Sequence, residues 1–485
     1  MTEDDVGTVQ AAEAAVEGLP GAVSLAPSSV VPALGGELLL APKDTVRAGL
    51  LQAGPLAVAG LVANGANVIV TVLLARLLTT RGYGELNVLT GLFLIVSMPG
   101  SAVIVAVVRR VTATKGDQVQ QWARRLHRQA TVALVVFAAV VVAVGGWLAG
   151  VLNQRDAGGM DAILIAGAVW ILLCLDRGLL QAHRSYRTLA ANLLVEGGVR
   201  TVAMLCLVGA GLGPTGAAVG VLVAEVVTAV HARVMADRVW ATEAGPVVAS
   251  GGSRRRARHA APGPVGRWVA ALRTERVAPA AERRAAIVDL VTALVALAMA
   301  ALLQNVDVIV LGREAPAESG SYAAVSVASK ALVFGAIVLA GYLLPEAAIR
   351  WREGGHALRQ LAVTLLLLGI PAVLLLAVAV AAPHLLLSVV FSSRYLGAES
   401  AFLPLALAMV CLSVTVILTM YLLAVGRRWI TVLLVLGGVA ATVAVAEAHG
   451  VPLSTARADL AVQAVLAVAT VIGFALVHRR RLRGG

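Results

Sequence analysis

One apolar stretch, residues 303–350, contains polar side chains that a lipid bilayer penalises. Gln304, Asn305 and Asp307 lie close together, and Lys330 interrupts the same stretch further along. A charge at the middle of a bilayer costs roughly 2.5–3.5 kcal/mol on insertion scales, so such groups usually serve a function or pair with one another. Gln304 and Asp307 are three residues apart and would share one helix face. We predict that Asp307 and Lys330, together with Glu225 in another apolar stretch, line a polar pathway.

Charged and amide groups interrupt other apolar stretches in the same way. Glu196 and Arg200 are four residues apart, which places them on one helix face as a neutralising pair or as lining groups. Glu225 lies deep in its stretch, with no obvious partner on its own helix. Arg76 either snorkels to the interface or lines the mouth of a cavity. Asn67, on the same helix, either lines that cavity or bonds a neighbouring helix.

The composition is that of a multi-pass membrane protein. The chain has 485 residues, of which 59% are hydrophobic and 14% charged, and its mean hydropathy is +0.88. A soluble protein of this size carries about 25% charged residues. The net charge of +12 does not indicate a nucleic-acid partner, because the arginines gather at the ends of apolar runs.

Enzymatic chemistry is not indicated. The three cysteines lie inside apolar runs, and the eight histidines are scattered without the spacing of metal ligands. No glycine-rich loop is followed by the Lys-Ser/Thr pair of an ATPase, and no nucleophile stands near a base. We therefore expect neither an enzyme nor a cofactor, with a coupling cation, H⁺ or Na⁺, as the one small partner.

Twelve apolar runs are long enough to cross the roughly 30 Å of hydrocarbon as helices. We predict spans at 48–76, 86–108, 130–151, 161–182, 190–211, 214–234, 286–311, 321–344, 360–382, 401–424, 429–448 and 459–477. The turn from Gly211 to Pro214 separates the fifth span from the sixth. The fold class is an all-α polytopic membrane protein.

The loops predict the orientation of the spans. One alternate set of loops is rich in arginine, and the other holds one arginine or none per loop. Because basic loops stay inside, both termini and the central loop are expected in the cytoplasm of a bacterial inner membrane, with anionic lipid head groups against the basic loops. The predicted domains are a disordered acidic tail, a six-helix bundle, a basic linker, a second six-helix bundle and a basic tail, at residues 1–45, 46–234, 235–285, 286–478 and 479–485.

A weak repeat supports two equivalent halves. Asn67 precedes Gly82 by the same interval as Asn305 precedes Gly320, and a tyrosine follows each glycine closely. Both segments lie at the end of the first span of a six-span half. Two six-helix halves related by an axis along the membrane normal would produce this pattern.

Several segments resemble the polysaccharide-biosynthesis and oligosaccharide flippases of the multidrug/oligosaccharidyl-lipid/polysaccharide exporter superfamily. The matching segments are residues 305–312, 320–324, 74–78, 82–84, 391–407 and 421–427. The resemblance implies two six-helix bundles around a V-shaped cleft that opens alternately to each side. It also implies a lipid-linked, phosphate-bearing glycan as substrate, bound by a cationic cavity, and glycan polymerisation or export machinery as further partners.

The resemblance also suggests roles for the polar residues. Arg76 and Asp307 lie in the matched motifs, whereas Arg200 and Lys330 are added for their depth and charge. Arg76, Arg200 and Lys330 would then contact phosphate, with Asn67 beside them. The acidic groups would balance these charges or bind the coupling cation; they are Asp307, Glu225 and Glu196, with Gln304 alongside.

Three alternatives remain. A cation-coupled drug exporter of the multidrug-and-toxin-extrusion branch shares the architecture, although an aromatic-rich, acidic cavity would be expected and aromatic residues make up only 4% of this chain. A major-facilitator transporter would carry a Gly…Asp…Gly-Arg-Arg/Lys signature, which residues 109–128 lack. A non-transporting membrane scaffold would recruit partners through the basic loop, and its Arg200 and Lys330 would pair internally.

Overall fold

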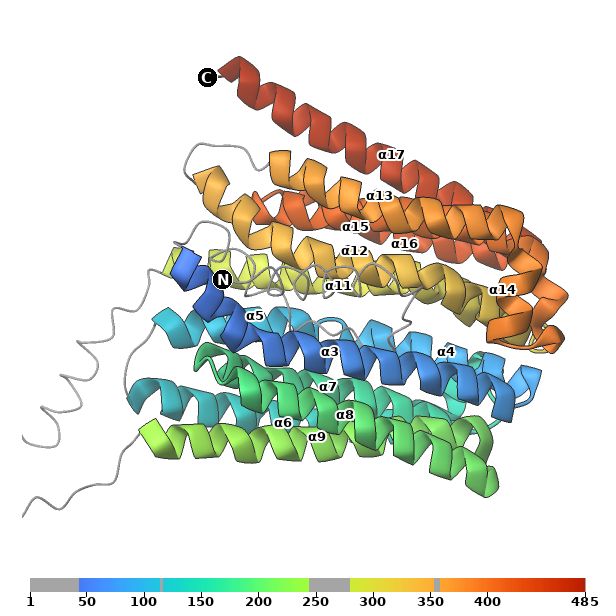
Figure 1. The fold of residues 1–485 in the computed structure, drawn as a ribbon, viewed down its shortest axis with the longest axis horizontal. Helices are drawn as coiled ribbons and strands as arrows, with labels where there is room; N and C mark the ends of the chain where they lie inside the picture. Colours follow the sequence, from blue (N-terminus) through green and yellow to red (C-terminus); the bar gives the residue numbers. More distant parts are fainter. Residues whose placement is uncertain (1–42, 114–116, 244–279, 353–357, 485) are drawn as a thin grey trace, which may run out of the picture.

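The computed structural model describes residues 43–113, 117–243, 280–352 and 358–484. Within these ranges the chain is helical apart from short turns and contains no β-strand (Figure 1). Eleven runs are long and apolar enough to cross a membrane, and the run Tyr186–Trp240 holds two helices. The described part of the chain therefore offers twelve crossings. This confirms the predicted all-α polytopic fold.

The first half comprises six crossings. They are α3 (Lys43–Leu77), α4 with α5 (Thr80–Ser97 and Gly100–Ala113), α6 (Asp117–Val151), α7 (Ala157–Ala182), α8 (Tyr186–Leu207) and α9 (Gly213–Glu243). Pro99 divides the second crossing into α4 and α5, because proline lacks the amide hydrogen that would continue the helix. Gly211 (φ 89°) and Gly213 (φ 56°) adopt positive φ values that glycine tolerates, and so allow the tight turn between α8 and α9.

The second half also comprises six crossings. They are α11 (Ala280–Glu314), α12 (Ser319–Arg352), α13 (Leu358–Ala381), α15 (Phe402–Ala424), α16 (Trp429–Ala446) and α17 (Pro452–Gly484). Two short elements precede α15, namely α14 (Pro383–Val390) and the 3₁₀ helix η2 (Ser393–Ala401). Neither short element was predicted. They have no counterpart between α6 and α7, where a short turn suffices.

Some predicted domains lie partly or wholly outside the described residues. Residues 1–42 of the predicted tail and 244–279 of the predicted linker are among these. At the ends of that linker, α9 continues to Glu243 and α11 begins at Ala280. The predicted basic tail at 479–485 begins as the last turns of α17.

The helices of the two halves pack in the same pairs. In the first half α3 packs against α8, α7 packs against both α6 and α9, α8 against α9 and α5 against α7. The corresponding helices of the second half form the pairs α11–α16, α15–α13, α15–α17, α16–α17 and α12–α15. The matched pairs confirm that the weak sequence repeat reflects two equivalent bundles, which lie one above the other in Figure 1.

Contact between the halves is concentrated where α3 ends and α4 begins, which we call the outer end. Helix α4 packs against both α11 and α12. A Cβ atom on Gly320 would overlap the Thr80 carbonyl oxygen, and one on Gly84 would overlap the Ser319 side chain. Glycine at these two positions therefore lets the first turns of α4 and α12 approach backbone to backbone.

The unpredicted segment α14–η2 reaches across to the other half at this outer end. Arg394 Nη2 donates hydrogen bonds to the carbonyl oxygens of Ala75 and Arg76, the latter at 2.8 Å. Tyr395 Oη donates to the Ala75 oxygen at 2.5 Å, and Arg76 Nη2 donates to the Val389 oxygen at 3.1 Å. The last carbonyls of a helix have no partner within it, so this segment completes the end of α3.

Candidate functional site

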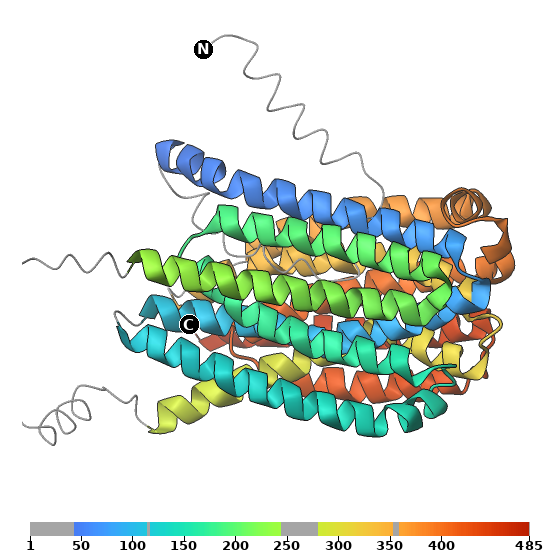
Figure 2. The same ribbon diagram turned by 90° about the horizontal axis from the view of Figure 1, so that it is seen from below.

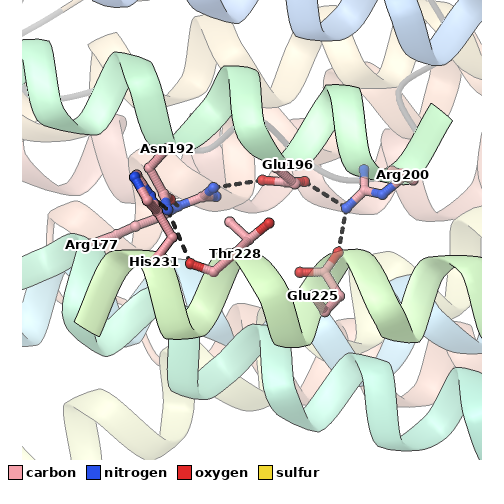
Figure 3. A network of polar contacts seen from close by, with 7 residues as sticks. All are labelled: Arg177, Asn192, Glu196, Arg200, Glu225, Thr228 and His231. Carbon is pink, nitrogen blue, oxygen red and sulfur yellow. Dashed lines mark hydrogen bonds and ion pairs between the residues drawn. The ribbon is translucent and has the colours of Figure 1, made fainter. Parts of the chain in front are cut away.

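Three helices of the first half share a chain of buried charged groups, drawn in Figure 3. Arg177 Nη2 donates to Glu196 Oε2 at 2.6 Å. Arg200 Nη2 donates to Glu196 Oε1 at 2.5 Å and also to Glu225 Oε1. Both arginine side chains are 1% exposed and Glu225 is fully buried. Two guanidinium groups and two carboxylates make this cluster electrically neutral.

The chain of contacts continues along α8 and α9 through uncharged groups. Arg177 Nε donates to Asn192 Oδ1 at 2.8 Å, and Asn192 Nδ2 donates to the Thr228 carbonyl oxygen at 3.0 Å. Asn192 Nδ2 also lies 3.0 Å from His231 Nδ1. Arg177 additionally sits over the Trp170 ring, 5.1 Å from its centroid. We call these groups, together with Glu196, Arg200 and Glu225, the first-half network.

The first-half network leaves hydrogen-bonding capacity unused. Arg200 Nε and Nη1, Arg177 Nη1 and Glu225 Oε2 are buried and have no partner among the described residues. A buried polar group without a partner costs about 1–3 kcal/mol. These arginine N–H groups would therefore gain from an acceptor, either water or an oxygen of a bound anion.

A second cluster lies in the other half, on α11 and α12. Asp307 Oδ2 accepts hydrogen bonds from Tyr322 Oη at 3.1 Å and Ser326 Oγ at 3.3 Å. Lys330 Nζ donates to Asp307 Oδ1 and to Asn305 Oδ1, each at 3.4 Å. The Asp307 side chain is fully buried and that of Lys330 is 7% exposed. Asp307 and Lys330 thus compensate each other's charge.

Helix α17 adds a second carboxylate, Asp459, to this cluster. Asp459 is fully buried and interacts electrostatically with Asp307 and Lys330. Its Oδ1 accepts from Gln463 Nε2 at 3.2 Å, and its Oδ2 has no partner among the described residues. Gln463 Nε2 also donates to the Leu303 carbonyl oxygen at 3.1 Å. We call Asp307, Lys330, Asp459 and their partners the second-half network; among the described residues Lys330 pairs with Asp307, and the carboxyl group of Asp459 has no ion-pair partner.

The structure brings together some of the residues predicted from the sequence and separates others. Glu196 and Arg200 pair as their spacing suggested, and Glu225 joins them from α9. Lys330 pairs with Asp307 in the other half, so Arg200 and Lys330 do not share one site.

The remaining predicted residues stand apart from both networks. Arg76 is exposed at the end of α3, bonded to Val389. Asn67 is buried on α3, where its carbonyl oxygen accepts from Thr71 Oγ1 at 2.8 Å. Gln304 is buried, and its Nε2 has no partner among the described residues.

The sequence analysis missed Asp459, Tyr322 and Ser326 as members of a polar site. The predicted last span begins at residue 459, which placed the aspartate at the very end of that span. Helix α17 instead begins at Pro452, two turns earlier, so Asp459 lies inside the bundle. The available signal was Gln463, four residues later and hence on the same helix face.

No family model matches the sequence, and no curated protein is recognisably similar to it. Solved structures do share its fold. One is a MOP superfamily transporter from Pyrococcus furiosus, described as having a binding pocket of reversed polarity that suggests a different function. It is 12% identical, with a TM-score of 0.56 over 92% of this chain and 98% of that one.

Two further structures agree with this comparison. A multidrug resistance MATE family transporter of the MOP superfamily, in an outward-facing conformation, is 12% identical, with a TM-score of 0.57 over 93% of this chain and 98% of its own. A MATE structure in the straight conformation is 13% identical, with a TM-score of 0.58 over 94% of this chain and 99% of its own. The chain therefore has the multi-pass helical fold of MATE and other MOP superfamily transporters.

Proposed function

We propose that this protein is a secondary transporter of the MOP superfamily that moves a lipid-linked oligosaccharide or polysaccharide precursor across a bacterial inner membrane. The observation that carries the transport proposal is the pair of equivalent six-helix bundles, each with its own buried polar network and joined at the outer end. Two rigid bundles that separate at one end and meet at the other provide alternating access.

The contacts at the outer end make this mechanism testable. Val88 on α4 and Gly312 on α11 belong to different halves, and a Cβ built on Gly312 lies 3.9 Å from the Val88 Cβ. This is close to the mean Cβ separation of a disulfide, about 3.8 Å. A Val88→Cys/Gly312→Cys disulfide would therefore hold the outer end closed.

We expect this disulfide to abolish transport in oxidised proteoliposomes and a reductant to restore it. The background would carry alanine in place of Cys174, Cys206 and Cys411. The controls, treated with the same oxidant, are Val88→Cys alone and Gly312→Cys combined with Val88→Ala, because a Cβ on Gly312 would overlap the Val88 Cγ2. Both should keep transporting. Full transport by the cross-linked double variant would contradict alternating access through the outer end.

The second-half network is proposed as the site of the coupling cation. Its second carboxyl group, that of Asp459, has no ion-pair partner among the described residues, and its buried Oδ2 offers an oxygen for a proton or Na⁺. Hard cations prefer such carboxylate and carbonyl oxygens. The first-half network, being neutral and holding two arginines, is less suited to a cation.

The first-half network is proposed to contact the substrate phosphate. Arginine donates two parallel hydrogen bonds to phosphate, and Arg177 and Arg200 hold N–H groups without a partner among the described residues. Glu196 and Glu225 neutralise both guanidinium groups in the conformation seen here, so Arg200 would reach a phosphate only after one carboxylate releases it. Arg76, near the outer end, would provide a further cation along the path.

A cation-coupled multidrug exporter is the second candidate. The pairing of Arg200 and Lys330 with carboxylates favours it, because that pairing removes two of the free cations expected in a phosphate-binding cavity. The fold is also that of a structure described as a multidrug resistance MATE transporter. The resemblance of sequence segments and the low aromatic content favour the flippase.

The deciding experiment measures transbilayer movement of a labelled polyprenyl-pyrophosphate glycan and of cationic dyes in the same proteoliposomes. We compare wild type with Arg200→Gln/Glu225→Gln, which removes one charge of each sign and keeps the buried cluster neutral. Movement of the glycan lipid by wild type, lost in this folded double variant, supports the flippase and the role of Arg200. Movement of dyes alone would replace the flippase by the drug exporter, and movement of neither would contradict both.

A further inference from the structure

The first turns of α6, at the end that the loop charges predict to be cytoplasmic, carry three arginines on the surface that faces away from the protein. Helix α6 packs mainly against α7 and lies at the edge of the first half (Figure 2). Arg124, Arg125 and Arg128 are all exposed. Arg128 lies four residues after Arg124 and three after Arg125, so the three side chains are neighbours on the helix surface. The neighbouring His127 points inward instead, with its Nδ1 3.5 Å from Asp176 Oδ1.

None of these three arginines has a carboxylate partner among the described residues. Arg233, on the neighbouring α9, shows the contrast: it pairs with Asp176 at 3.4 Å and Asp237 at 2.8 Å. The three positive charges on α6 are therefore uncompensated within the described structure. A partner that complements them must supply negative charge from outside the bundle.

The surface changes from basic to apolar within one turn of α6. Val132 and Val135 continue the stripe of Arg124 and Arg128 and are 59% and 62% exposed. Such exposed valines on a membrane-crossing helix face lipid chains. One helical turn rises about 5.4 Å, so arginine side chains one turn from lipid-facing valines are close enough to reach phospholipid head groups.

The surface of α6 is shallowly hollowed at this change, beside Arg128, Gln129, Val132 and Ala133. Its polar end offers N–H donors, and its apolar end offers methyl groups. This is the order in which a phospholipid presents its phosphate and its acyl chains.

We propose that the exposed face of α6 around Arg124, Arg125 and Arg128 binds the head group of an anionic phospholipid of the cytoplasmic leaflet. Guanidinium groups donate to the phosphodiester oxygens, while the acyl chains follow Val132 and Val135. This site is separate from both buried networks, and it does not depend on the transport proposal.

The test compares thermal unfolding of the full chain in nanodiscs of phosphatidylcholine alone with nanodiscs that also contain phosphatidylglycerol. A ligand that binds only the folded state raises the unfolding temperature, so we expect the anionic lipid to stabilise wild type by a few degrees. Arg124→Gln/Arg125→Gln/Arg128→Gln should lose most of this shift. The matched control is Arg184→Gln/Arg187→Gln/Arg427→Gln, which removes the same charge from exposed arginines on other turns and should keep the shift.

Four results would overturn the proposal. Equal loss of the shift in both triple variants would mean that only the general surface charge matters. No preference of wild type for the anionic lipid would remove the site, and an equal shift with inorganic phosphate in phosphatidylcholine nanodiscs would mean a soluble anion. If wild type prefers the anionic lipid only after deletion of the acidic residues 2–40, the arginines bind that segment of the chain in the intact protein and not a lipid.

Discussion

Arg200→Ala is expected to lower the free energy of unfolding by about 3–5 kcal/mol, the usual cost of removing one partner from a buried ion pair. Arg200 is 1% exposed and contacts both Glu196 and Glu225. Without it, Glu196 keeps Arg177, but Glu225 loses its ion-pair partner among the described residues while remaining fully buried. The measurement is thermal unfolding of the detergent-purified protein.

Two further variants separate the loss of charge pairing from the loss of packing. Arg200→Gln/Glu225→Gln removes both members of the pair and should recover most of the stability, because no unpaired buried charge remains. Arg155→Ala is the matched control: Arg155 is 59% exposed, and its partner Glu85 keeps Arg81 at 3.1 Å, so the loss should be at most about 1 kcal/mol. Similar losses from Arg200→Ala and Arg155→Ala would show that the buried cluster is not held by its charges.

Asp459→Asn is expected to lower cation-driven accumulation of substrate about tenfold without lowering stability. The carboxyl group of Asp459 is the one in the second-half network without an ion-pair partner among the described residues, and an amide in its place can neither take up a proton nor offer a carboxylate oxygen to Na⁺. If this removes about 1.4 kcal/mol of differential cation binding, accumulation falls about tenfold. Stability should stay level or rise, because Asp459 Oδ2 is buried without a partner among the described residues.

The opposite directions of these effects distinguish a functional carboxylate from a structural one. Uptake driven by a proton or Na⁺ gradient is measured in proteoliposomes, alongside exchange without a gradient, which should persist. Asp237→Asn serves as the control, since Asp237 is 52% exposed and pairs with Arg233 on its own helix. An Asp459→Asn variant that is strongly destabilised yet still coupled would contradict the proposed cation site.

The sequence alone determined the helices and their number. Lipid offers the backbone no hydrogen-bonding partner, so each long apolar run must form a helix, whatever its neighbours. The break at Gly211–Pro214 follows from the same local chemistry, because its glycines adopt positive φ values. The pairing of Glu196 with Arg200 was also predictable, since residues four apart on a helix always lie on one face.

Contacts between helices were decided by the tertiary structure. Glu225 has no partner on its own helix, and only the packing of α8 against α9 brings Arg200 to it. Asp459 and Asp307 are distant in the chain and share a site because α11, α12 and α17 meet. Single-helix periodicity carries no information on which faces of different helices meet.

The outer end shows the same division. The spacing of Asn67 and Gly82, repeated at Asn305 and Gly320, predicted two equivalent halves. It could not predict that Arg394 and Tyr395 complete the last turn of α3, because they come from an irregular segment that the first half lacks. A sequence repeat records what the halves share, whereas the contacts that join them depend on where they differ.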